Sequence, residues 1–109
     1  MTSQSTKNTM LTLSVPVPVI AAGGTQFYEI DASSAAVTVK LPAPVAGAVA
    51  TFFAIDATNS VTISATTAGK INGNASESIT LENAGDAIAL IADSATDWRY
   101  LNISTTNLS

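Results

Sequence analysis

Acidic residues beside predicted turns are the side chains of this chain that come closest to a chemical site. Asp93 and Asp97 flank one short polar segment, and Asp56 and Asp86 lie at the ends of other predicted strands. Paired carboxylates can bind Ca²⁺, or act as the acid and the nucleophile of a glycosidase. However, the dense acidic spacing of a calcium loop is absent, and Asp commonly caps its own turn. We therefore predict turn-forming carboxylates and no catalytic residue, cofactor or metal.

Aromatic residues offer a second kind of site. Trp98 and Tyr100 lie two positions apart, so in a strand they project from one face and could stack on a sugar ring. The alternative is an anchoring role in the core or between subunits, where buried aromatic rings dominate the energetics. We predict the anchoring role for these two residues and for Phe52 and Phe53.

Missing residue types narrow the function classes further. The 109 residues include no His and no Cys. Catalytic mechanisms that need a Ser-His-Asp or Cys-His group are therefore excluded, and so is a zinc-bound water held by imidazoles. Only chemistry based on carboxylate, Lys or Tyr groups remains, and we predict that the protein is not an enzyme.

The charge of the chain also limits its partners. Four basic residues face eight acidic ones, for a net charge of −4, and only 11% of residues are charged. Binding to nucleic acid or to an anionic membrane needs clustered Lys and Arg, so neither partner is expected. A surface so poor in charge is typical of one that contacts other protein.

Alternating apolar and polar residues predict short β-strands and no helix. Turn signals rich in Gly, Pro, Asp and Asn separate them every 8–12 residues, as is typical of sandwiches and barrels. The predicted strands cover residues 26–31, 35–41, 49–55, 60–64, 78–82, 86–92 and 98–103. We predict an all-β, single-domain antiparallel β-sandwich or jelly-roll-like barrel, without a strict internal repeat.

The chain divides into an N-terminal arm with an edge strand, residues 1–25, and a β domain, residues 26–109. Pro16 and Pro18 remove two donors from one edge of the strand, so that edge cannot be fully paired. One face of the strand is apolar and needs a surface to cover it, which we expect to be a neighbouring subunit or a larger assembly. The residues of this face are Leu11, Leu13, Val15, Val17 and Val19.

Two predicted strands, residues 49–55 and 86–92, are apolar on both faces. A monomeric sandwich buries only one face of each sheet. Small apolar residues on the second face therefore indicate a contact between subunits. The alternative is that alanine is simply tolerated at the surface, much of which is apolar in any protein.

The order of several short motifs resembles that of small tailed-bacteriophage virion proteins, which include capsid decoration (cement) proteins and β-modules of head or tail fibres. Each motif is weak alone, and the resemblance depends on their order and spacing over about residues 28–103. The motifs are Ile30-Asp31-Ala32, the segment from Val37 to Gly47, Asp56-Ala57-Thr58-Asn59, Gly69-Lys70-Ile71-Asn72-Gly73, the segment from Gly85 to Asp93, and Asp97-Trp98.

The resemblance implies a homotrimer of small β-rich subunits, with terminal arms that reach a neighbour or the shell. It also implies a virion structural protein that binds the major capsid protein and stabilises the outer surface of a phage head. Such a protein is made in the host cytoplasm and resides on the capsid exterior. The alternative is a fibre or receptor- and carbohydrate-binding β-module that uses exposed loops near Asp93 and Asp97.

Overall fold

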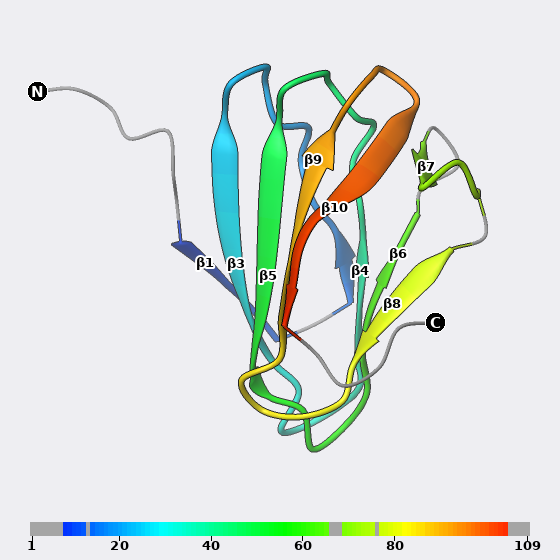
Figure 1. Cartoon of the computed structure of the whole chain (residues 1–109). Coiled ribbons are helices and arrows are strands. Elements are labelled where there is room, and N and C mark those ends of the chain that lie inside the picture. Colours follow the sequence, from blue (N-terminus) through cyan, green and yellow to red (C-terminus); the bar gives the residue numbers. More distant parts are fainter. Residues whose placement is uncertain (1–7, 13, 66–68, 76, 105–109) are drawn as a thin grey trace, which may run out of the picture.

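Two β-sheets face each other and enclose the core (Figure 1). The computed structural model describes residues 8–12, 14–65, 69–75 and 77–104. All regular elements in these ranges are strands, so the predicted all-β class is confirmed. The seven strands predicted after residue 25 are all present, as β3 to β6 and β8 to β10.

One sheet has six strands and the other has four. In order across the first sheet, the strands are β1 (Asn8–Leu11), β3 (Thr25–Asp31), β5 (Val49–Asp56), β9 (Ala87–Ala92), β10 (Asp97–Ser104) and β7 (Lys70–Ile71). The second sheet consists of β2 (Val15–Pro16), β4 (Val37–Lys40), β6 (Val61–Ser64) and β8 (Ser78–Leu81).

The pairing of the strands corrects the predicted antiparallel sandwich. Strands β1, β3 and β5 run parallel in one sheet, and β2, β4 and β6 run parallel in the other. From β1 to β6 the chain changes sheet after every strand, so each return enters the first sheet in the same direction (Figure 1). Parallel neighbours need such a crossover, which here is a strand of the facing sheet. Antiparallel pairing begins only with β8, β9 and β10, and it includes the predicted β9–β10 hairpin.

This winding contains a repeat that the sequence analysis did not detect. We call the pairs β1–β2, β3–β4 and β5–β6 the first, second and third rungs. Val15, Val39 and Ile63 lie in register on successive rungs. Ser14 Oγ accepts a hydrogen bond of 2.8 Å from the backbone amide of Thr38, 24 positions further along the chain. A register shift after Ile30 interrupts the period, which hides it in the sequence.

Equivalent turns stack at both ends of the rungs. Gly23 and Gly47 both have positive φ, at 78° and 91°, and the amide of Gly23 donates to the Gly47 carbonyl at 3.3 Å. At the other end, Asp31 Oδ1 and Asp56 Oδ1 each accept from the backbone amide two residues on, at 3.0 and 2.8 Å. The same turn chemistry therefore recurs on the second and third rungs.

The core lies between the sheets and is built from the inward-facing residue of each alternating pair. Val37, Val39, Val61 and Ile63 come from the small sheet, and all four are fully buried. In the large sheet the rings of Tyr28 and Phe52 stack at a centroid distance of 5.3 Å. Trp98 is also fully buried, and its Nε1–H donates to the carbonyl oxygen of Pro42 at 3.1 Å.

The predicted edge strand is present, because β1 and β2 each lie at an edge of a sheet. Val17 donates its amide inward to the carbonyl of Lys40 at 3.1 Å. The adjacent positions in an extended strand face the other way, so Pro16 and Pro18 lie on the open edge, where their missing donors cost no pairing. The two prolines therefore block extension of the small sheet.

Part of the apolar side of this segment packs on its own chain. Val17 belongs to the core of its own chain, and Leu11 packs against that core. Val19 lies at the surface, with 61% of its area exposed. Leu13 and the side chain of Val15 lie outside the described residues. The first rung is therefore part of the folded chain, with β1 in the large sheet and β2 in the small one.

Candidate functional site

The outward face of the six-stranded sheet is the strongest candidate site. Strands β5 and β9 form its centre, where inward and outward residues alternate with every position. The outward side chains are mostly apolar and remain partly or largely exposed. We call this surface the apolar face, and its residues are Met10, Phe27, Val49, Thr51, Phe53, Ala87, Ala89 and Ile91.

Large and small side chains lie next to each other on the apolar face. The rings of Phe27 and Phe53 contact each other on β3 and β5, with a centroid distance of 6.4 Å and an interplanar angle of 36°. We call this pair the aromatic ridge. On the adjacent strand β9, Ala87 lies opposite Phe53 and Ala89 lies opposite Thr51. We call these two alanines the alanine furrow, because their small side chains leave the surface low beside the ridge.

The outward face of the four-stranded sheet has the opposite character. Thr38 and Thr62 are in register there, and Thr62 in turn pairs with Thr80. The outward residues of β4, β6 and β8 are all polar: Thr38, Lys40, Thr62, Ser64, Ser78 and Thr80. The fold therefore solvates one sheet with hydroxyls and leaves the other apolar. Tolerated alanines alone do not explain Phe53, Val49 and Ile91, so the contrast favours a contact with protein.

Few charges interrupt the apolar face. Glu29 lies on β3 beside Met10 and Phe53, where it is half-buried. Arg99 lies at the β10 side, and its Nε donates to Asp93 Oδ2 at 2.9 Å. This hydrogen bond raises the pKa of Arg99, but both partners are exposed, and such pairs contribute little to stability. The β9 part of the face carries no charge, whereas Glu29 lies directly beside Phe53.

The predicted aromatic anchors lie in different places. Phe52 and Trp98 are both fully buried in the core, so neither ring is available for a sugar. Phe53 lies on the apolar face, together with Phe27, which the sequence analysis did not single out. Neighbouring residues of a strand face opposite sides, so an inward Tyr28 implies an outward Phe27.

The predicted turn carboxylates do not converge on one site. Asp86 Oδ2 accepts from the backbone amides of Glu82 and Asn83, each at 3.1 Å. Asp56 accepts hydrogen bonds from the hydroxyl and the backbone amide of Thr58, and these hydrogen bonds lower the pKa of Asp56. Across the described ranges, no group of three or more acidic, His or Cys side chains could hold a metal ion. These carboxylates act within their own turns.

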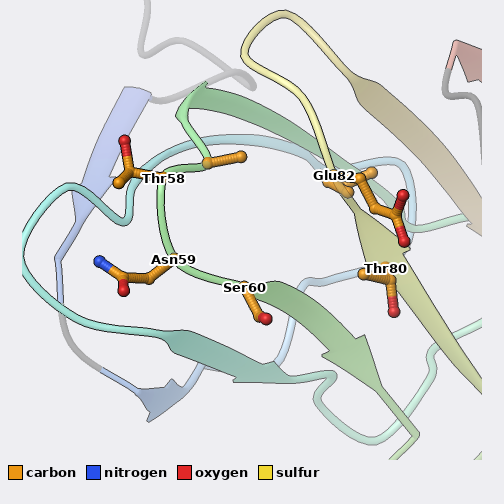
Figure 2. A pocket seen from close by; sticks show the side chains of 7 residues that line it. Thr58, Asn59, Ser60, Thr80 and Glu82 are labelled. Carbon is orange, nitrogen blue, oxygen red and sulfur yellow. The ribbon is translucent and has the colours of Figure 1, made fainter.

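A polar pocket opens beside the ends of β6 and β8 (Figure 2). Its volume is about 270 Å³, and Thr58, Asn59, Ser60, Thr80 and Glu82 surround it with two apolar residues. The amide of Asn59 is held in place, since Nδ2 donates to the carbonyl of Ala32 at 2.8 Å. No aromatic ring lines the pocket, so it lacks the stacking surface that the sequence analysis associated with a sugar site.

Tyr100 provides a pH-dependent test of the packing at the β10 side. Its hydroxyl donates to Glu77 Oε2 at 2.9 Å, and partial burial together with this contact raises the pKa of Tyr100 to about 12. Because the folded state then holds the phenolic proton more tightly than the unfolded state, the added stability is complete below pH 10 and is lost as pH rises through about 12.

We expect Tyr100→Phe to weaken this alkaline loss of stability. Urea denaturation of both proteins at several pH values measures it, and the difference between them removes the contribution of Tyr28, whose pKa burial also raises. Equal pH dependence of the two proteins would show that the phenol of Tyr100 is not held by Glu77.

Comparison with known proteins adds no relative. No family model matches the chain, and no curated protein is detectably similar to it. The described part of the chain has no helix long and apolar enough to cross a membrane.

Proposed function

We propose that the protein is a non-enzymatic virion structural protein: a trimeric decoration (cement) protein that binds the major capsid protein and stabilises the outer surface of a phage head. It would be made in the host cytoplasm and function on the capsid exterior. The single observation that best supports a role in assembly is the apolar face, which contrasts with the hydroxyl-covered face of the other sheet.

Composition supports the same proposal. The chain has no His or Cys, which removes the commonest catalytic groups, and it has only four basic residues, which disfavours nucleic acid as a partner. The identification with the phage head depends on the order of the motifs between residues 28 and 103. The proposal includes a jelly-roll-like fold of that class. The winding of the parallel rungs differs from the antiparallel winding of a jelly roll.

We propose the first rung as the contact with the major capsid protein. Of the five residues expected to make it, Leu11 and Val17 already pack on their own core, which leaves Val19 as an exposed apolar side chain of the set. Val19 is therefore available to a second protein.

The pocket beside β6 and β8 favours a second candidate, a fibre or receptor-binding β-module. Its hydroxyl, amide and carboxylate groups are of the kinds that bind a polar ligand such as a glycan. This candidate would use loops at strand ends and would need no contact with a capsid.

Decoration of capsids tests the proposal. Heads of the phage that encodes the chain, prepared without it, should take up the purified protein to a fixed number of copies and then withstand higher temperature. Sedimentation of bound protein and a thermal disruption assay measure the two effects. Val19→Asp should reduce the uptake, whereas Thr62→Asp on the polar face should not. Heads that take up no protein, together with binding of the chain to a host glycan, would support the fibre module instead.

A further inference from the structure

We infer that the apolar face is covered by the apolar face of a second copy of this chain, with the aromatic ridge of one copy packed against the alanine furrow of the other. This contact is two-fold and closes a dimer, so it goes beyond the proposed function and is not the threefold contact of the proposed trimer. The contact with a capsid is thereby left to other parts of the surface.

The shape of the face fits a copy of itself. Phe53 on β5 and Ala87 on β9 are register partners, so a large and a small side chain lie at the same height on adjacent strands. A second sheet whose strands run along the first can place its β9 over β5 and its β5 over β9. Each Phe53 ring then faces an Ala87 methyl group, which keeps two packed sheets near their usual spacing of about 10 Å.

The size of the face is sufficient. Six strands at about 4.8 Å spacing, with central strands of six to eight residues, give a sheet face on the order of 600 Å² in projection. A standard protein interface buries about 800 Å² per partner, with side chains adding to the projected area. A face smaller than this by several fold would have favoured a minor contact only.

The charges are placed as an interface requires. The ridge and the furrow contain no charged residue, and the nearest, Glu29, lies on β3 between Phe53 and Met10. Arg99 lies toward the opposite side and is occupied by Asp93. A charged rim around an apolar centre is the usual anatomy of a protein contact. The exposed cations of this sheet, Arg99 and Lys70, lie on β10 and β7, away from the ridge and the furrow.

A charge placed in the furrow tests the inference. We expect the wild-type chain to be oligomeric at micromolar concentration, and Ala89→Glu to shift it to the mass of the 11.0 kDa chain in light scattering. Thr62→Glu, at an outward position of the other sheet, is the matched control and should remain oligomeric. Circular dichroism melting of each variant shows whether it is folded.

Chemical cross-linking keeps the test decisive if Ala89→Glu does not fold. The chain has no cysteine, so Phe53→Cys and Ala87→Cys each introduce a single thiol. A mixture of the two variants should cross-link through a short bis-maleimide more than either variant alone, because a ridge residue faces a furrow residue across the contact. A mixture of Phe53→Cys and Thr62→Cys should cross-link less.

The outcomes separate this inference from the proposed function. A wild-type monomer overturns both the inference and the trimer. An oligomer that survives Ala89→Glu and shows no excess of ridge-to-furrow cross-links overturns the inference and leaves the trimer standing on another surface. A dimer that Ala89→Glu dissociates supports the inference and contradicts the trimer.

Discussion

Replacing Trp98 with alanine is expected to lower the free energy of unfolding by about 3–5 kcal/mol, a large share of the about 5–15 kcal/mol available to a typical domain. The indole is fully buried between the sheets, so its removal leaves a cavity that the neighbouring strands cannot fill. The carbonyl of Pro42 also loses the hydrogen bond from Nε1. Urea denaturation followed by circular dichroism measures the loss.

Two variants divide this loss into its causes. Trp98→Phe retains much of the ring but removes the donor, and the unpaired Pro42 carbonyl should account for about 1–3 kcal/mol. Phe53→Ala truncates an aromatic ring on the apolar face, so it should change the stability of the monomer much less and should weaken self-association. If Trp98→Ala melted like wild type and instead lost glycan or receptor binding, the fibre module would be supported and the buried anchor would be wrong.

The first rung gives the second large effect. Val17→Asp places an unpaired carboxylate in the core, where Val17 is only 6% exposed, and we expect it to destabilise the fold by about 3–5 kcal/mol. Val19→Asp makes the same chemical change two positions away, at 61% exposure, and should leave the melting temperature nearly unchanged. Thermal denaturation of the two variants at low protein concentration measures the difference.

This pair distinguishes a rung of the fold from a detached arm. Equal stability of the two variants would mean that the segment containing Val17 leaves the core in solution and folds only against a partner. A large loss in Val17→Asp alone supports the packing described above, and any loss of capsid binding by Val19→Asp is then a surface effect.

Strands could be predicted from the sequence because alternation along a strand is local. Val37 and Val39 face inward while Thr38 faces outward, and this pattern is visible without knowledge of the partner strand. The hairpin between β9 and β10 could be predicted for the same reason, since its turn joins sequence neighbours. The edge position of the proline segment followed from a property of proline itself.

Parallel pairing could not be predicted in this way, because it depends on which sheet each strand joins. The alternation of β3 and β4 is the same whether they form a hairpin or lie in facing sheets. The extra residue in β5 also shifts the spacing between Asp31 and Asp56, so the repeat is hidden from a simple comparison. Likewise, the proximity of Phe27 and Phe53 arises from parallel register and not from any local motif.

The parallel rungs also limit the order in which the strands can form during folding. Each parallel pair joins strands separated by a full rung, so no early hairpin can start the large sheet from β1, β3 or β5. Closing such loops costs entropy before any contact compensates for it, and chains rich in distant pairings fold slowly. The β9–β10 hairpin is the local structure best able to form first, with β5 adding to β9 and the earlier rungs following. During synthesis the N-terminal rungs therefore emerge before β8 and β9, the strands that pair with the third rung. Until those strands are made, the edges of β5 and β6 stay unpaired.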